Sequence, residues 1–346
     1  MLKSLNLKNF TVFRSASLTF SDNVNVFVGE NGLGKTHLLK IIYGVASTLA
    51  TGQKISNTGP TKAFLQTALA TSFREVFKPD ALGRLVRRQA GRNRCDVSAV
   101  FENSAWNIGF SLNTATKSEI PLEISPSQWL DKRPVYLPTH DLMGLYPGFV
   151  SLYELHRLPV ESIWRDVCLL LGSPLAKGPR EKIVKKLLEP LEEIMDGKIE
   201  LDGERFYLKS KTGRIEMSLV AEGHRKLAMI ARLIATGSLL DKGLLLWDEP
   251  EANLNPVIIK KVAKTILELA SQGLQIFIAT HSLFLLRELE ILQQSDAFKT
   301  IKFRCFGLHN TDDGVEIKQG ESMDDIGDIS ALDEELMQSE RYLKLG

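Results

Sequence analysis

Gly29-Glu30-Asn31-Gly32-Leu33-Gly34-Lys35-Thr36 is the stretch that decides the fold of this 346-residue chain. Its spacing, G-x-x-x-x-G-K-[ST], is that of a phosphate-binding loop. An apolar run at residues 24–28 precedes it and a helical pattern at residues 37–42 follows, which is the strand, loop and helix order that the motif needs. Glycines let backbone N–H groups point at a polyphosphate, and the helix start adds the positive end of its dipole. The loop therefore predicts a site where Lys35 reaches the β and γ phosphates and Thr36 holds Mg²⁺.

The composition is that of an ordinary globular protein, with 44% hydrophobic and 25% charged residues and a formal net charge of +1. Because the overall charge is small, any affinity for nucleic acid must come from a local patch. The three cysteines are far apart and show no C-x-x-C spacing, which argues against a disulfide framework or a structural zinc site. No secretory apolar region and no run of roughly 18 apolar residues is present. We therefore expect a soluble, cytoplasmic protein with no membrane partner.

Two further apolar runs end in polar residues that carry chemistry. Residues 243–247 lead into Asp248 and Glu249, and residues 274–280 lead into His281. In an open α/β sheet the ligand sits in the crevice at the carboxyl ends of the strands. Asp248 is thus predicted to support Mg²⁺, Glu249 to take a proton from the attacking water, and His281 to contact the γ-phosphate. A lone histidine is more often structural, but its place after the other two motifs favours the functional interpretation.

These three motifs together resemble those of the ATP-binding-cassette (ABC) ATPases. Residues 5–13, taken with the loop, resemble more closely the chromosome-maintenance (SMC), RecF and OLD-type branch than a transporter cassette. The resemblance implies an α/β fold, an ABC-type ATPase head with a mixed or parallel sheet. Alternating residues at 96–101 and 106–112 add an inserted β segment, and helical spacing from 151 to about 195 adds a helical lobe. The resemblance also implies ATP and Mg²⁺ as ligands, and a homo-oligomer, ATP-dependent or constitutive, in which ATP lies between two heads.

In that branch a signature loop from one head caps the γ-phosphate held by the other. The matching segment is residues 219–227, where Gly223 at a helix start keeps backbone N–H groups able to face an anion. Ala221 stands where the family has a serine, so the resemblance leaves open how fast ATP is hydrolysed. The family's Q-loop glutamine also has no match, and His140 or Asp141 occupies roughly its place.

The expected organisation has a discontinuous core. The ATPase core is predicted at residues 1–50 and 196–320, an inserted β segment and helical lobe at 51–195, and an acidic C-terminal helix at 321–346. That helix either docks a partner or packs on its own domain. The insert carries five arginines, which could bind nucleic-acid phosphates or an acidic partner, or form a solvated hairpin edge: Arg84, Arg87, Arg88, Arg92 and Arg94.

Three functions remain open at this point. The chain lacks the long coiled-coil arms of chromosome-maintenance proteins, and too few residues follow His281 for the nuclease domain of OLD-type enzymes. It resembles stand-alone bacterial anti-phage defence ATPases, which work as switches with a separately encoded effector, often a nuclease. The alternatives are a RecF-like DNA-repair ATPase that binds duplex DNA, and a scaffold that ATP locks together with little turnover.

Overall fold

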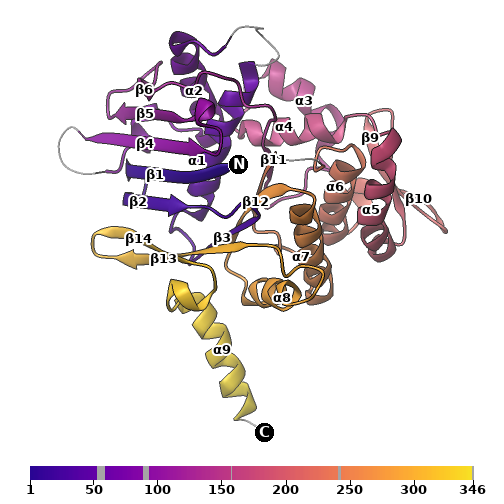
Figure 1. Cartoon of the computed structure of the whole chain (residues 1–346). Helices are drawn as coiled ribbons and strands as arrows, with labels where there is room; N and C mark the ends of the chain where they lie inside the picture. Colours follow the sequence, from indigo (N-terminus) through magenta and orange to yellow (C-terminus); the bar gives the residue numbers. More distant parts are fainter. Residues whose placement is uncertain (53–58, 89–92, 157, 241–242, 345–346) are drawn as a thin grey trace.

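A six-stranded sheet forms the centre of the molecule (Figure 1). The computed structural model describes residues 1–52, 59–88, 93–156, 158–240 and 243–344. The strand order is β14-β13-β3-β12-β11-β7, and only the β13–β14 pair is antiparallel. These strands are β3 (Val24–Val28), β7 (Val135–Leu137), β11 (Gly243–Asp248), β12 (Leu274–Thr280), β13 (Phe303–Thr311) and β14 (Gly314–Gly320).

The inner strands are apolar because both faces of this sheet are covered. Every residue of β3 is buried. Val24, Val26 and Val28 point into the core on the side of the later helices, whereas Phe27 points into the core shared with the second sheet. Side chains of a strand alternate between faces, so a continuous apolar run marks a strand covered on both sides. This explains why the three motif-bearing strands could be recognised from the sequence.

A second, antiparallel sheet lies beside the first in the order β2-β1-β4-β5-β6. Its strands are β1 (Leu2–Phe10), β2 (Phe13–Thr19), β4 (Arg94–Phe101), β5 (Ile108–Asn113) and β6 (Leu122–Ile124). The region predicted as an insertion thus supplies strands to both large sheets, because β4 pairs with β1 and β7 pairs with β11. The division of the chain into a core and an insert stays a prediction.

Aromatic side chains fill the space between the two large sheets. Phe20 meets Phe277 edge to face with ring centroids 5.0 Å apart, and Phe27 lies at the same distance from Phe306. Two buried hydrogen bonds also join the sheets: the Gln275 side chain accepts from the Leu2 N–H and donates to the Leu2 carbonyl. The start of β1 is therefore held against β12 across 273 residues of sequence.

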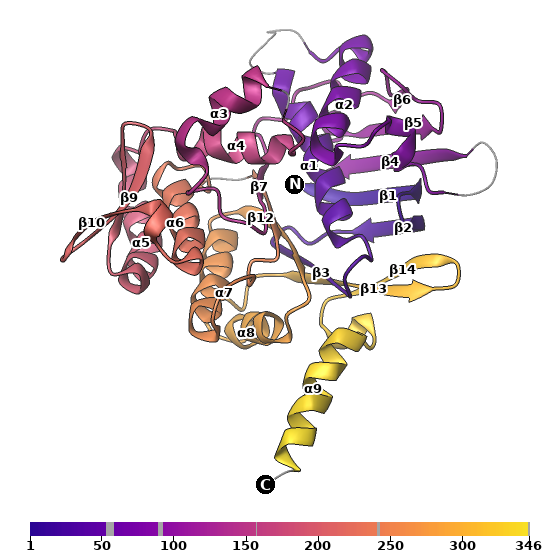
Figure 2. The ribbon, with the colours of Figure 1, turned by 180° about the vertical axis from the view of Figure 1, so that it is seen from behind.

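Helices cover the sheets in two groups (Figures 1 and 2). The first group packs into the core between the two sheets and comprises α1 (Lys35–Thr51) and α2 (Lys62–Phe77). The second group covers the other face of the central sheet and comprises α6 (Glu222–Ala235), α7 (Pro256–Ser271) and α8 (Leu283–Gln293). A helical lobe with a small antiparallel sheet adjoins it: α3 (Tyr146–Leu155), α4 (Ser162–Leu171), α5 (Glu181–Met195), β8 (Lys198–Asp202), β9 (Arg205–Ser210) and β10 (Gly213–Glu216).

The C-terminal helix α9 (Ser330–Leu343) extends away from the body in both views (Figures 1 and 2). Only its beginning packs on the domain, because Leu332 is buried while Tyr342 and Leu343 are each 76% exposed. It begins later than the predicted acidic segment, whose first residues instead form a short 3-10 turn, Asp324–Ile326. Within the described parts of the chain, no helix has both the length and the apolarity that crossing a bilayer requires.

Candidate active site

The three predicted motifs meet at one edge of the central sheet. Strands β3, β12 and β11 are parallel neighbours, with Val28 paired to Thr280 and Ala279 paired to Asp248. Because parallel strands end at the same edge, the phosphate loop, the Asp248-Glu249 pair and His281 emerge side by side. The arrangement is the one expected from the order of motifs along the chain.

Lys35 lies at the centre of the phosphate loop. It is only 6% exposed, and its ammonium donates to the carbonyl oxygens of Gly29 (2.7 Å) and Glu30 (2.9 Å). Burial lowers the pKa of Lys35, while the nearby carboxylates of Glu249 and Asp248 oppose that shift. The buried ammonium is thus held by hydrogen bonds to the loop's own carbonyl oxygens, as a buried charge requires.

The loop needs glycine at Gly34 for two reasons. Its φ of +92° lies in the left-handed region, which side chains rarely adopt. A Cβ at this position would also lie 2.7 Å from Val12 Cγ2 and 2.8 Å from the Phe13 ring. The turn between β1 and β2 therefore packs directly on the phosphate loop.

The oxygens of Thr36 and Asp248 fit a magnesium ion. The Thr36 hydroxyl donates to Asp248 Oδ2 at 2.9 Å, which is the spacing of adjacent ligands about 2.0–2.1 Å from an octahedral ion. The described residues contain no group of three His, Cys, Asp or Glu side chains able to hold a metal. Mg²⁺ commonly takes one or two protein oxygens and completes its shell with phosphate oxygens and water. Burial raises the pKa of Asp248, and hydrogen bonds from Thr36 and Tyr136 oppose this only in part.

Glu249 and His281 lie next to each other. The Glu249 backbone has a φ of +48°, and its N–H donates to the carbonyl of Ala279 at 2.9 Å. His281 Nδ1 lies 3.3 Å from Glu249 Oε1, although their orientation makes no hydrogen bond and Nδ1 has no partner among the described residues. A turn residue in a strained conformation thus directs its carboxylate to the sheet edge beside a half-exposed imidazole.

Three further residues belong to this site and were missed by sequence reasoning. The Tyr136 hydroxyl donates to Asp248 Oδ2 at 3.1 Å, and Glu251 accepts from the Thr280 hydroxyl at 2.6 Å. Lys226 of α6 donates to the carbonyl oxygens of Glu249 (2.7 Å) and Ala252 (3.2 Å). Tyr136 lies between Val135 and Leu137, and Lys226 directly precedes the apolar run that begins at Leu227; these positions were the available signal. Burial lowers the pKa of Lys226 to about 8.

The predicted signature segment packs on the loop that follows Glu249. Ala221 is the N-cap of α6 and makes no side-chain capping bond. The Asn253 amide donates to the Glu222 carboxylate at 2.9 Å, and a Cβ on Gly223 would lie 3.2 Å from the Asn253 carbonyl. Within one chain, therefore, the helix start that carries Gly223 is joined to the Asp248-Glu249 strand end.

The loop after β7 also contacts α6. The Asp141 carboxylate pairs with Arg225 at 3.0 Å, and the His140 ring lies edge-on to Trp164 at 6.5 Å. Asp141 thus links the loop after β7 to the predicted signature helix. The equivalent of the Q-loop glutamine stays open.

The four described arginines of this run differ in what surrounds them. Arg84, Arg87 and Arg88 line a cavity beside the phosphate loop. Arg94 pairs with Asp96 and Glu123 on the antiparallel sheet. Arg92 lies outside the described residues.

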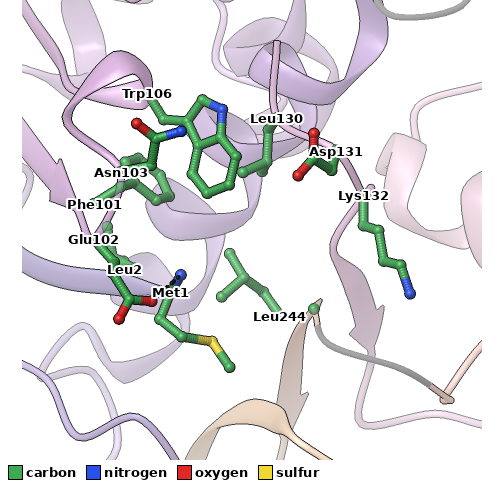
Figure 3. A pocket seen from close by; sticks show the side chains of 11 residues that line it. Met1, Leu2, Phe101, Glu102, Asn103, Trp106, Leu130, Asp131, Lys132 and Leu244 are labelled. Carbon is green, nitrogen blue, oxygen red and sulfur yellow. Dashed lines mark ion pairs between the residues drawn. The ribbon is translucent and has the colours of Figure 1, made fainter. Parts of the chain in front are cut away.

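A different cavity of about 320 Å³ lies at the amino end of β1 and β11 (Figure 3). Leu2, Phe101, Leu130 and Leu244 form its buried apolar lining, and Trp106 faces Leu244 across it. We refer to it as the amino-end cavity. None of the predicted site residues lines it.

Comparison with known proteins agrees with this geometry. Residues 24–287 match the family described as "AAA domain, putative AbiEii toxin, Type IV TA system". The chain belongs to this family. The matched residues include the phosphate loop, the Asp248-Glu249 pair and His281.

The chain is also similar to curated proteins and to solved structures. It is 45% identical over 56 residues to the DNA replication and repair protein RecF of Macrococcus caseolyticus, a match that covers 16% of this chain and only 15% of that protein. A SmcHead bound to the C-winged helix domain of ScpA matches with a TM-score of 0.56 and 14% identity, covering 93% of this chain and 98% of the other.

A Pyrococcus furiosus Smc head bound to the C-terminal domain of ScpA matches with a TM-score of 0.51 and 11% identity, covering 99% of both chains. At these identities the structural likeness shows the fold alone. The predicted fold class is confirmed, because the chain shares the fold of these Smc heads.

Proposed function

We propose that the protein binds and hydrolyses ATP with Mg²⁺ at the carboxyl edge of its central sheet. The observation that carries this proposal is the contact of Thr36 with Asp248, which joins the phosphate loop to the strand that ends in Glu249. Lys35 and the loop N–H groups, from Gly29 to Thr36, would hold the β and γ phosphates. Thr36 and Asp248 would hold Mg²⁺, whose charge stabilises the charge that develops on the transferred phosphoryl group.

In the proposed reaction Glu249 accepts a proton from the attacking water and His281 contacts the γ-phosphate. Glu249 is suited to this because its carboxylate lies at the sheet edge, only 26% exposed, beside the imidazole. Lys226, which holds the Glu249 carbonyl, would keep that carboxylate in position.

We further propose that two copies close around ATP, with the Gly223 helix start of each facing the γ-phosphate held by the other. The exposed start of α6 supports this, since helix N-termini bind anions. In this proposal dimerisation is a switch that controls a separately encoded effector, such as a nuclease, in anti-phage defence. The family description, which names a toxin, supports a role in a toxin-type system.

Two alternatives rest on specific observations. The 56-residue match to RecF favours a DNA-repair ATPase. Ala221, which caps α6 without a side-chain bond, favours a scaffold that closes on ATP and hydrolyses it slowly.

The test compares Lys35→Ala and Glu249→Gln with the wild-type protein. Mg-ATP binding is measured by calorimetry, phosphate release by a continuous assay, and mass by light scattering. We expect Lys35→Ala to lose ATP binding, because a charged phosphate contact is removed. Glu249→Gln should keep ATP, turn it over about 100-fold or more slowly, and double in mass when ATP is added.

Each outcome bears on a separate part of the proposal. Wild-type turnover in Glu249→Gln would contradict its role as general base. An unchanged mass with ATP bound would contradict ATP-driven dimerisation. If the protein is instead a dimer without ATP, a Gly223→Asp variant should still lose turnover. ATP-dependent binding of duplex DNA by the protein alone would favour the RecF-like alternative.

A further inference from the structure

The amino-end cavity lies where β11 begins, at the opposite end of this strand from Asp248 (Figure 3). Leu2, Leu130 and Leu244 are among the buried apolar residues that line it. Protein interiors are close-packed and leave few spaces larger than a water molecule. The cavity has a volume of about 320 Å³, whereas an apolar cavity of about 150 Å³ already holds benzene. There is therefore room for a molecule with two fused aromatic rings.

Hydrogen bonds and ring contacts hold the walls of this cavity in place. The Trp106 indole N–H donates to the Trp129 carbonyl at 3.0 Å. The Trp106 ring also lies edge-on to Phe101, with ring centroids 6.4 Å apart. The Leu130 N–H donates to the Leu49 carbonyl, at the end of α1, at 2.9 Å. The cavity is thus formed by the fold itself, as small-molecule sites usually are before the ligand binds.

One carboxylate at the cavity has no charge partner. Asp131 lines the cavity, is exposed, and makes no hydrogen bond or ion pair with another residue that the structure describes. Glu102, the other acidic lining residue, lies 3.7 Å from the Lys3 ammonium. The Lys132 side chain extends away from the other lining side chains (Figure 3). The cavity therefore combines an apolar interior with one unpaired carboxylate at its edge.

We propose that the amino-end cavity binds a small aromatic amine, with its rings among Leu130, Leu244 and Trp106 and its ammonium beside Asp131. The apolar walls disfavour a molecule that is polar throughout, because a polar group buried there without a partner costs free energy. An ammonium at the edge can donate a charge-assisted hydrogen bond to the carboxylate, and an indole attracts cations through its π face. This inference goes beyond the proposed function, because none of the residues assigned to ATP lines the cavity.

The test compares related ligands on the full chain by calorimetry. Tryptamine carries the rings and the ammonium, 3-ethylindole lacks the ammonium, and indole-3-acetate has a carboxylate in its place. We expect tryptamine to bind, 3-ethylindole to bind about fivefold more weakly, and indole-3-acetate to bind most weakly, because its charge faces a charge of the same sign. Each titration is repeated with saturating Mg-ADP, which should leave the affinity for tryptamine unchanged because the two sites are separate.

Two variants locate the binding site. Asp131→Asn should lower the affinity for tryptamine about fivefold, to that of 3-ethylindole, whose own affinity should not change. Leu244→Phe adds volume to the cavity wall and should weaken the binding of both ligands. The matched control is Asp312→Asn, which removes another exposed carboxylate, at the turn between β13 and β14, and should change neither affinity. Equal thermal unfolding midpoints verify folding.

Four results would overturn the inference. The first is that tryptamine does not bind the wild-type protein, and the second is that it binds no more tightly than 3-ethylindole. Loss of tryptamine binding in saturating Mg-ADP would place the amine in the nucleotide site instead. An equal loss of affinity in Asp312→Asn would show a general effect of net charge. If Leu244→Phe does not fold, Asp131→Asn decides the question, because this exposed substitution leaves the apolar walls intact.

Discussion

The two ends of strand β11 have opposite chemistry. Leu244, near its start, lines the amino-end cavity, and Asp248, at its end, contacts Thr36 of the phosphate loop. The two residues are four positions apart, or about 13 Å at roughly 3.3 Å per residue. Buried apolar side chains lie around the first, although Glu102, Asp131 and Lys132 also line that cavity. Carboxylates, an imidazole and a buried ammonium gather at the second. In a parallel sheet the strand direction alone decides which end receives the polar residues.

This contrast predicts that the two ends respond independently to substitution. Effects of changes more than about 7–10 Å apart, without shared partners, usually add. Substitutions at the carboxyl end should change nucleotide chemistry, and those at the amino end should change stability alone.

Asp248→Asn should have the largest effect. The amide keeps the shape of the side chain but removes the charge that faces Mg²⁺, so turnover should fall about 100-fold or more. Phosphate release is measured across a magnesium titration, with magnesium-free ATP binding as the control. Wild-type turnover at saturating magnesium would contradict the assignment of Asp248 to the metal.

Lys226→Met should reduce turnover by an intermediate amount, about tenfold. The substitution keeps a long unbranched side chain but removes the donor to the Glu249 and Ala252 carbonyls, so the carboxylate of Glu249 is less well placed. ATP affinity should stay within about twofold of the wild type, since Lys226 does not line the phosphate loop. Equal losses of affinity and turnover would show that Lys226 acts on binding instead.

The same lysine predicts a pH dependence of stability in the protein free of nucleotide. Its pKa is about 8 in the fold against an ordinary value of 10.5, so between these pH values the unfolded chain binds more protons. The free energy of unfolding should therefore rise with pH in this window. Urea unfolding at pH 8 and pH 10 should show the wild type gaining stability relative to Lys226→Met. Parallel changes in the two proteins would contradict the lowered pKa.

Leu244→Ala should have the smallest effect on turnover, which we expect to be unchanged. The side chain is 6% exposed, so its loss should lower the free energy of unfolding by about 2 kcal/mol, the low end for leucine, because one side already faces a cavity. Urea unfolding and ATP binding are measured on the same sample. A change in ATP affinity in a folded variant would show that the two ends of β11 are coupled.

Elements that depend on neighbouring residues were predictable from the sequence. The phosphate loop, its flanking strand and helix, and the strands ending in Asp248 and His281 each depend on a contiguous apolar or glycine pattern. Since strand order and direction follow from the fold class, their convergence at one edge could also be anticipated. The hairpin of β13 and β14 was missed, although Asp313-Gly314 is a turn signal between alternating residues.

The contacts between distant segments were decided by the tertiary structure alone. Tyr136 reaches Asp248 across 112 residues, and Lys226 reaches the Glu249 carbonyl across 23. The meaning of the arginine run depends on the pairing of residues 85–87 with the end of β1, which places part of the run at the phosphate loop. Local periodicity tells which face of an element is buried but not which distant side chain it meets, because that partner is selected by packing and long-range strand pairing. The sequence by itself thus determined the chemistry of the site, and the fold determined which residues support it.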